Sequence, residues 1–377
     1  MDNPDIDPRV FWSGYGLKAV HSGIYHYSYH IAKELQDLKP TVVGFNALDP
    51  MLSKYVNQKH LKKRFLSKIA ESKIFAPQIS FREALKCSND SKMVFHGLSN
   101  IDLPIFERGE SHSNRARFVL TVHDLIPLLY PKLVSRSYHL QFKYALPLAV
   151  KRADVIICVS EWTRRCLKRY CKTIDKEMLV IPNGMELATV QVDSCITSQA
   201  AQIRLLAVGR FESYKRFDRV ISVLSRYSDR CSFTVVTDAV GARFFHRYAS
   251  SYIDRGLLKV MTSLSNAELS GYYKNCDVFF HPSESEGFGL PAAEALSHGK
   301  SVVFQSGSGI DEVVSNKVGV GLEAERPVDD WVSAIEQAYS LTLESNWSDS
   351  LKEHFKTKNT WKDSANSLKS VYNQLLN

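Results

Sequence analysis

The sequence predicts an α/β protein built from two Rossmann-like, doubly wound domains. Strand-like runs alternate with helix-like runs along the chain, a pattern typical of mostly parallel sheets with helices between the strands. The length of 377 residues suits two domains better than one. Hydrophobic residues make up 44% of the chain and charged residues 23%, so each domain can bury a core.

Eleven runs are the expected strands, six in the first half and five in the second. In the first half they are residues 9–12, 41–45, 93–96, 117–122, 155–159 and 178–181. In the second half they are residues 204–208, 232–237, 257–261, 278–281 and 301–305. The stretch from Ala188 to Gln202 is rich in Ser, Thr, Ala and Gln and separates the two sets. We therefore expect one domain at residues 1–187, a linker at 188–202 and a second domain at 203–360.

Two glutamates, Glu286 and Glu294, flank a glycine-rich turn between the last two expected strands. The run is His281-Pro-Ser-Glu-Ser-Glu-Gly-Phe-Gly-Leu-Pro-Ala-Ala-Glu-Ala-Leu-Ser-His-Gly299. Pro291 suits a first helical position and Gly299 the position after a helix end. The amides that open such a helix attract an anion, and the carboxylates can accept hydrogen bonds from neutral hydroxyls beside it. Phosphate beside polyols describes a sugar nucleotide, whereas an ordinary crossover with two surface glutamates leaves the glycines unexplained.

A basic loop follows the first expected strand of the second half. Arg210 and Lys215 lie in the run Leu205-Leu-Ala-Val-Gly-Arg-Phe-Glu-Ser-Tyr-Lys-Arg-Phe-Asp218. Two cations at the carboxyl end of a strand can neutralise a diphosphate as it becomes a leaving group. The alternative is a solvated basic loop, and we interpret Arg216 as a surface residue.

The run around Glu286 and Glu294 resembles the E-x7-E signature of retaining GT-B glycosyltransferases, particularly glycosyltransferase family 4. The spacing of Arg210 and Lys215 is similar to the family's Gly-Arg-x4-Lys motif. The resemblance implies a GT-B fold, in which two Rossmann-like domains face a central cleft and the last helix, residues 361–377, crosses back to the first domain. It extends to bacterial mannosyl- and hexosyltransferases of surface polysaccharide synthesis.

The resemblance also implies roles for the residues of the second domain. Arg210 and Lys215 would contact the donor diphosphate, Glu294 the ribose hydroxyls, and Glu286 the transferred sugar and the positive charge at its anomeric carbon. Phosphate and sugar would also be held by the backbone amides around Gly287, Phe288, Gly289 and Leu290. Leu264 lies where family members place main-chain contacts to the base. The neighbouring Ser265 is equally well explained as a helix N-cap, with Glu268 completing a capping box.

Three segments of the first domain resemble family runs on the acceptor side. Ser22-Gly23-Ile24-Tyr25 is similar to Gly-Ile-Gly-Arg-Tyr, with Gly23 placed for backbone contact to phosphates but with Tyr25 and His26 where Gly and Arg are usual. His123 and Asp124 end an expected strand, where polar residues face the cleft. The resemblance places His123 near the donor sugar or the acceptor hydroxyl. Asp124 could be catalytic or could cap the next loop. Ser160 is expected to be an N-cap that faces the cleft.

Ser306-Gly-Ser-Gly-Ile-Asp-Glu312 opens another short helix after the last expected strand. One interpretation is a second anion site. The other is a tight turn that packs near the loop of Glu286.

A surplus of positive charge suggests a surface partner. The net charge is +8, and the segment from Lys54 to Lys73 carries seven Lys or Arg against one acid. Leu61, Phe65 and Ile69 recur every four residues, which predicts a basic amphipathic helix that could bind an anionic membrane or pack on the sheet. Nucleic acid is not an expected partner, because no recognition motif accompanies the charge.

The remaining patterns exclude several classes of protein. The seven cysteines have no metal-type spacing, which favours reduced thiols and a cytoplasmic protein. The first residues lack the apolar core of a signal peptide, and no apolar run is long enough to span a bilayer. Asp5 and Asp7 form a D-x-D pattern before the first strand, where we expect no metal role. We find no G-x-G-x-x-G for a nicotinamide cofactor and expect neither cofactor nor metal.

The expected function is the transfer of a hexose from a nucleotide diphosphate sugar to a glycan or lipid-linked glycan. Mannose from GDP-mannose is the preferred donor, and UDP-sugars are the alternative. A nucleotide-sugar epimerase or a phosphorylase can share the two-domain architecture. A non-enzymatic membrane-binding module would leave the glutamate loop unexplained.

Overall fold

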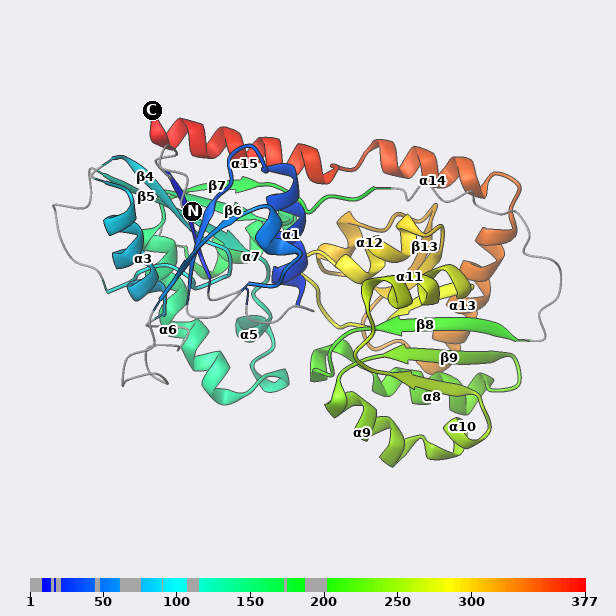
Figure 1. Cartoon of the computed structure of the whole chain (residues 1–377). Helices are drawn as coiled ribbons and strands as arrows, with labels where there is room; N and C mark the ends of the chain where they lie inside the picture. Colours follow the sequence, from blue (N-terminus) through cyan, green and yellow to red (C-terminus); the bar gives the residue numbers. More distant parts are fainter. Residues whose placement is uncertain are drawn as a thin grey trace. The chain divides into compact units, whose positions relative to one another are not determined.

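The computed structural model describes residues 9–14, 17, 22–44, 48–61, 76–89, 91–106, 115–172, 175–186 and 202–377. They divide into two compact units (Figure 1). The first unit holds the described residues up to Leu129 together with Ser135–Gly184 and Asn359–Asn377. The second holds Tyr130–Val134 and the described part of Met185–Lys358.

The first unit is built on a seven-stranded parallel sheet with strand order β3-β2-β1-β4-β5-β6-β7. The strands are β1 (Val10–Ser13), β2 (Thr41–Gly44), β3 (Asn57–His60), β4 (Met93–Gly97), β5 (Ala116–Val122), β6 (Val155–Cys158) and β7 (Glu177–Val180). The helices are α1 (Gly23–Glu34), η2 (Leu52–Lys54), α3 (Ala76–Cys87), α5 (Ile126–Leu129), α6 (Arg136–Arg152), α7 (Glu161–Tyr170) and α15 (Trp361–Leu376).

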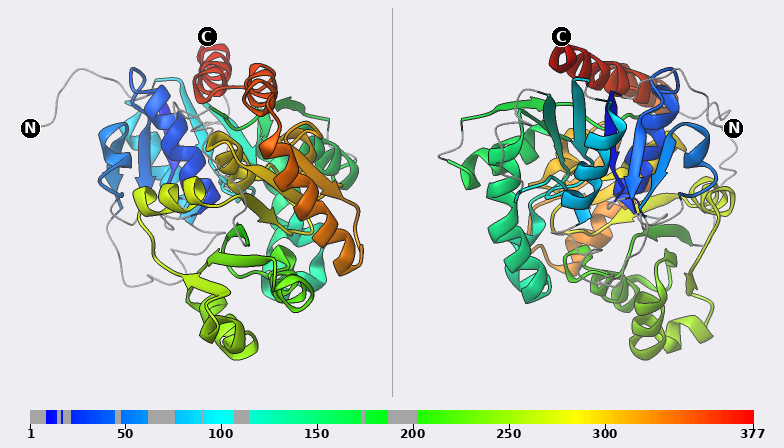
Figure 2. Two further views of the ribbon diagram at one scale, coloured as in Figure 1. Left: turned by 90° about the vertical axis from the view of Figure 1, so that its right-hand side faces the viewer. Right: turned by 60° about the vertical axis from the view of Figure 1, so that its left-hand side comes forward.

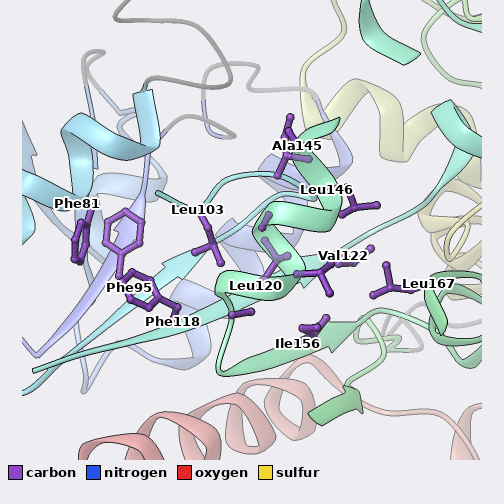
Figure 3. Close-up of a cluster of buried hydrophobic side chains, with 14 of the residues drawn as sticks. Phe81, Phe95, Leu103, Phe118, Leu120, Val122, Ala145, Leu146, Ile156 and Leu167 are labelled. Atoms are coloured by element: carbon purple, nitrogen blue, oxygen red, sulfur yellow. The ribbon is translucent and has the colours of Figure 1, made fainter. Parts of the chain in front are cut away.

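One face of this sheet forms a hydrophobic core with three helices. Phe81 of α3, Leu146 of α6 and Leu167 of α7 pack into the same cluster as the strand residues Phe95 and Leu120 (Figure 3). The inner strands β1, β2, β4 and β6 are mostly apolar and fully buried, because a parallel sheet between helix layers is covered on both faces.

The C-terminal helix α15 belongs to the first unit and lies beside α1 (Figures 1 and 2). It begins with a capping box between Thr360 and Asp363. The ring of Trp361 stacks on His30 of α1 with centroids 4.5 Å apart. The predicted return of the last helix to the first domain is therefore confirmed.

The second unit is built on a six-stranded parallel sheet with strand order β10-β9-β8-β11-β12-β13. The strands are β8 (Ile203–Val208), β9 (Cys231–Val236), β10 (Leu258–Met261), β11 (Val278–His281), β12 (Ser301–Gln305) and β13 (Gly319–Leu322). The helices are η3 (Pro131–Leu133), η4 (Ser213–Lys215), α8 (Asp218–Tyr227), α9 (Ala239–Tyr248), α10 (Ser250–Asp254), α11 (Asn266–Asn275), α12 (Leu290–Ser297), η5 (Gly309–Glu312), α13 (Val328–Leu343) and α14 (Trp347–Lys356).

The predicted α/β class with two Rossmann-like parallel sheets is confirmed, and all eleven predicted strands lie within one residue of observed ones. Two edge strands escaped prediction. Strand β3, with the sequence Asn-Gln-Lys-His, has no apolar residue, as suits an edge that must not pair with another chain. Strand β13 contains Gly319 and Gly321, and a Cβ on Gly319 would lie 2.5 Å from the carbonyl oxygen of Val302.

The predicted helix from Lys54 to Lys73 is wrong over its first part. Lys54 ends the short turn η2, and residues 57–60 form β3 against the edge of β2. The backbone of these residues pairs with a neighbouring strand, a contact that side-chain periodicity does not report. Residues 62–73 lie outside the described part of the chain, as do most of the predicted linker and the D-x-D pattern.

Two general features concern the whole described chain. None of its helices is long and apolar enough to cross a membrane. The cysteines that the structure describes are all free thiols.

Candidate active site

The order of the strands places a candidate site in the second unit between β8 and β11. From β8 the chain proceeds to β9 and β10 on one side, and β11 to β13 then lie on the other side. Ligands of doubly wound sheets bind at such a switch point, outside the carboxyl ends of the strands. The loops that begin there are residues 209–217 after β8 and 282–289 after β11.

Glu286 is the centre of this site and receives two hydrogen bonds on one oxygen. Lys215 Nζ donates to its Oε1 at 2.6 Å and His281 Nε2 to the same atom at 2.9 Å. All three side chains are largely buried. The two loops are also joined through their backbones, because the Glu284 amide donates to the Tyr214 carbonyl at 2.7 Å.

Glu286 is held as an anion. Burial by itself would raise the pKa of its carboxyl, but the charge of Lys215 and the hydrogen bond from His281 outweigh it and keep the pKa far below its usual range. Since an ionised carboxylate can only accept, His281 Nε2 carries a hydrogen. Such a carboxylate is a weak proton acceptor and a strong acceptor of hydrogen bonds from hydroxyls.

Residues 282–289, which we call the glycine loop, are fixed by close backbone contacts. Gly289 has φ +100° at the N-cap of α12, a left-handed conformation that favours glycine. The Glu286 amide donates to Ser308 Oγ at 3.1 Å, and the Gly309 amide donates to the Glu286 carbonyl at 2.9 Å. A Cβ on Gly309 would lie 2.1 Å from the carbonyl oxygen of Gly287.

Helix α12 begins at Leu290, as the loop pattern predicts. Pro291 lies in its first turn, and Gly299 follows its C-cap with φ +76°. Phe288 is buried against the unit. The first amides of a helix have no intrahelical carbonyl to bond. The N-terminus of α12 can therefore bind an anion.

The loop after β12 supports the glycine loop and is not itself arranged as a second anion site. The amides of Gly307 and Ser308 donate to the Asp311 carboxylate at 2.7 and 3.1 Å. Since a side chain of the protein takes these amides, the packing interpretation of residues 306–312 fits the structure.

Glu294 lies on α12, partly exposed, and is positioned by Tyr273 of α11. Tyr273 Oη donates to Glu294 Oε2 at 2.8 Å. Burial raises the pKa of Glu294 above its usual value, and this hydrogen bond only partly opposes the rise. The tyrosine ring stacks on His298 with centroids 5.2 Å apart, which fixes its direction.

Two residues that were predicted to bind the donor sugar nucleotide do not contact the cluster of Lys215, His281 and Glu286. The Arg210 side chain is 61% exposed, and Glu212, 4.0 Å away, is the carboxylate that it approaches. Leu264 lies in the turn between β10 and α11, where Ser265 and Glu268 form the predicted capping box. Strand β10 is at the edge of the sheet, two strands from β8.

Sequence reasoning missed the two side chains, Arg219 and Gln305, that hold the backbone of residues 282–284. Arg219 of α8 is buried and donates to the Pro282 carbonyl at 3.0 Å and to Gln305 Oε1 at 2.7 Å. Gln305 Nε2 donates in turn to the Glu284 carbonyl at 3.2 Å. Its spacing could have indicated that Arg219 is buried. It lies four residues before Val223, on the face of α8 that packs into the core.

In the first unit, His123 follows β5 and is held in one tautomer. Its amide donates to Asn100 Oδ1 at 2.6 Å, and its Nε2 lies 2.9 Å from the Leu98 carbonyl. Since a carbonyl only accepts, Nε2 carries the hydrogen and Nδ1 is left as an acceptor. Burial lowers the pKa of His123 to about 4, so the ring is neutral near pH 7. The Tyr27 ring packs edge-on against it with centroids 5.0 Å apart.

The other predicted residues of the first unit have structural contacts. Asp124 Oδ1 accepts from the Ile126 amide at 3.1 Å, the capping role that was one of its two interpretations. Ser160 is buried and caps α7 as predicted, accepting from the Thr163 amide at 3.0 Å. Gly23 is the first residue of α1 after the N-cap Ser22. Residues 18–21 before it lie outside the described part of the chain.

A buried polar network that the sequence did not reveal connects α15 to the sheet. Trp12 Nε1 donates to Tyr372 Oη at 3.0 Å, and Tyr372 Oη lies 2.6 Å from His96 Nδ1. His96 Nε2 lies 2.8 Å from Thr121 Oγ1. Burial lowers the pKa of His96 to about 3, so the ring stays neutral in the folded protein.

This network predicts that the protein loses stability in mild acid. The folded pKa of His96 is about 3, below the value of 6.5 for an unperturbed histidine. Between these values the unfolded chain binds a proton that the folded chain does not, so stability falls as the pH falls below about 6.5. At pH 5 His96 alone should account for about 2 kcal/mol of this loss.

Urea unfolding at pH 7 and pH 5 checks the prediction. The loss on acidification should be smaller in His96→Asn than in the wild-type chain, with the exposed His246→Asn as the control. An equal loss in His96→Asn and wild type would show that His96 is not the group concerned.

Among the residues that the structure describes, no group of three or more His, Cys, Asp or Glu side chains is arranged to hold a metal ion.

Two family models together match most of the chain. Residues 21–189 match "Glycosyltransferase Family 4" and residues 197–356 match "Glycosyl transferases group 1". An uncharacterised glycosyltransferase of Methanocaldococcus jannaschii is 24% identical over 260 residues, which cover 68% of each chain. The O-antigen chain mannosyltransferase of Salmonella typhimurium is 26% identical over 232 residues, 59% of this chain and 61% of that protein. These alignments span about two thirds or less of the relatives' length.

Solved structures show the same fold over nearly the whole chain. The sucrose-phosphate synthase of Thermosynechococcus elongatus superposes with a TM-score of 0.75 at 18% identity. The superposition covers 97% of this chain and 98% of that one.

Proposed function

Because the chain is a glycosyltransferase of the GT-B type, we propose that it moves a hexose from a nucleotide diphosphate sugar to a hydroxyl of a glycan or lipid-linked glycan, with retention at the anomeric carbon. One observation carries the proposal. At the switch point of the second unit, Glu286 is held as an anion by Lys215 and His281 beside the glycine-rich start of a helix.

Lys215 and Arg210 would neutralise the diphosphate. A lysine ammonium has three hydrogens, so Lys215 can keep its bond to Glu286 and donate to a phosphate oxygen as well. The exposed guanidinium of Arg210 can turn toward the same phosphates, because its contact with Glu212 is long. The amides around Gly287, Phe288, Gly289 and Leu290 would hold the phosphates and the sugar.

The two glutamates would bind different parts of the donor. Glu294, oriented by Tyr273, would accept from the ribose hydroxyls. Glu286 would accept from hydroxyls of the transferred sugar and stabilise the positive charge that develops at its anomeric carbon. The depressed pKa of Glu286 fits charge stabilisation and argues against a role as general base. Leu264 would contact the base through its main chain.

The reaction then needs positioning more than covalent chemistry. The acceptor hydroxyl would attack on the face that the diphosphate leaves, and a donor phosphate oxygen would take its proton. The protein would supply orientation and stabilise the leaving group's charge. In the first unit, Nδ1 of neutral His123 can accept a hydrogen bond from a sugar or acceptor hydroxyl and thereby orient it.

Mannose from GDP-mannose is the donor that we propose. The similarity to an O-antigen chain mannosyltransferase supports this choice and suggests a role in surface polysaccharide or lipopolysaccharide synthesis. We further propose that the enzyme works in the cytoplasm or at the inner face of the membrane and needs neither metal nor cofactor.

Product analysis with and without an acceptor tests the reaction class. The purified protein would be incubated with GDP-mannose and a panel of UDP-hexoses, with and without a chelator, and the products followed by nuclear magnetic resonance. We expect a glycoside with the anomeric configuration of the donor, formed only with acceptor and unaffected by the chelator. An epimerised donor or a sugar phosphate formed without acceptor would overturn the proposal.

A further inference from the structure

Helix α6 of the first unit exposes a row of large apolar side chains. Leu140, Tyr144 and Leu148 lie four residues apart on one face and are 38%, 65% and 44% exposed. The opposite face packs into the core, where Figure 3 shows Ala145 and Leu146. Phe142, Ala149 and Val150 are buried on the same face. The exposed row is therefore an additional surface of the helix and not a poorly packed core.

The same face carries positive charge without a carboxylate to balance it. Arg136, Lys143 and Lys151 are exposed and share this side of α6, since each lies three or four residues from a member of the apolar row. No Asp or Glu occurs between Asp124 and Asp154. None of the three cations pairs with a carboxylate in the described part of the chain. By contrast, α14 pairs its lysines with acids within the helix, as in Lys352 with Asp349.

We propose that this surface docks the protein on a lipid bilayer that carries anionic headgroups. We call it the α6 face and define it by Arg136, Leu140, Lys143, Tyr144, Leu148 and Lys151. The apolar side chains would enter the boundary between headgroups and acyl chains, and the cations would lie among the phosphates. Tyrosine suits such a boundary, because its ring is apolar and its hydroxyl is polar.

The chemistry of the face favours a bilayer over other partners. Nucleic acid would use the cations and the aromatic ring, but it offers nothing for the aliphatic Leu140 and Leu148. A complementary protein would have to carry several acids around an apolar ridge, whereas an anionic bilayer presents both features everywhere. The inference does not rest on the proposed transfer reaction, because docking on vesicles needs no donor sugar.

Flotation of the full chain with vesicles tests the proposal. We expect binding to vesicles of phosphatidylglycerol mixed with phosphatidylcholine, weak binding to phosphatidylcholine alone, and a decline with rising salt. Tyr144→Ser/Leu148→Ser should weaken binding to the mixed vesicles by about tenfold or more. Lys143→Gln/Lys151→Gln should weaken it by about tenfold or more as well.

The matched control is Tyr248→Ser on α9, where an exposed tyrosine also lies beside an arginine. This variant should bind as the wild-type chain does. The proposal is overturned if the wild-type chain does not bind anionic vesicles, or if both α6 variants bind them as the wild-type chain does. It is also overturned if short duplex DNA displaces the vesicles as strongly as added lipid, or if binding is lost only when cations of residues 62–73 are replaced.

Discussion

Replacing Lys215 by alanine is expected to lower turnover by about 10²- to 10³-fold, the usual cost of removing one group that stabilises developing charge. Lys215 is the cation that holds Glu286 at 2.6 Å, and it is proposed to meet the diphosphate as it leaves. Its loss would remove charge from the leaving-group side and would raise the pKa of Glu286. Steady-state kinetics with the preferred donor measure both kcat and KM, and most of the effect should fall on kcat.

The experiment requires a check of folding, because a buried carboxylate left without its partner can cost about 3–5 kcal/mol. Thermal unfolding monitored by circular dichroism supplies that check, and Lys215→Arg, which keeps the charge, should be more stable and more active than Lys215→Ala. Arg216→Ala is the matched control, since the neighbouring Arg216 pairs with Asp218 and Glu284 and not with Glu286. Near-normal turnover in a folded Lys215→Ala protein would remove Lys215 from the site.

Gly309→Ala should damage the donor site, although Gly309 itself is not proposed to contact the donor. The new methyl group would lie 2.1 Å from the Gly287 carbonyl oxygen and 2.9 Å from that of Glu286, so the glycine loop must move. A displacement of about 1 Å in a catalytic loop can lower turnover by about 10²-fold. We also expect a loss of about 1–3 kcal/mol in the free energy of unfolding, as for other overpacked sites.

Gly271→Ala separates this contact from the general effect of removing a glycine. Gly271 lies inside α11, and a Cβ there would meet nothing within 4 Å. The control should therefore retain full activity and gain about 0.5–1 kcal/mol of stability. If Gly309→Ala and Gly271→Ala have equal activity, the contact between the two loops does not position the donor site.

Much of the fold could be predicted because it depends on local sequence patterns. Buried parallel strands are short apolar runs between turn signals, and the strand, glycine loop and helix around Glu286 follow from residues that are adjacent in the sequence. Strand β3 could not be found this way, because its four polar residues become a strand only through pairing with β2. The mistaken helix from Lys54 has the same origin.

The side-chain contacts of the candidate site were less predictable. Sequence placed Lys215 and Glu286 in two loops of one domain, but their contact depends on β8 and β11 being neighbours in the sheet. From the sequence, Arg210 and Lys215 were predicted to have the same role. In the structure Arg210 is exposed, whereas Lys215 is largely buried. The network of His96 and Tyr372 joins residues 276 positions apart, and no local pattern marks such a contact.

The most direct test of the donor site is the thermal stabilisation of the purified protein by a panel of GDP- and UDP-sugars without added metal. A ligand that binds only the folded state must raise the unfolding temperature, and more so at higher concentration. We expect a clear shift with the sugars of one nucleotide, GDP by preference, and a smaller shift in Lys215→Ala. No shift with any sugar nucleotide, from a sample shown to be folded, would contradict the proposed donor site.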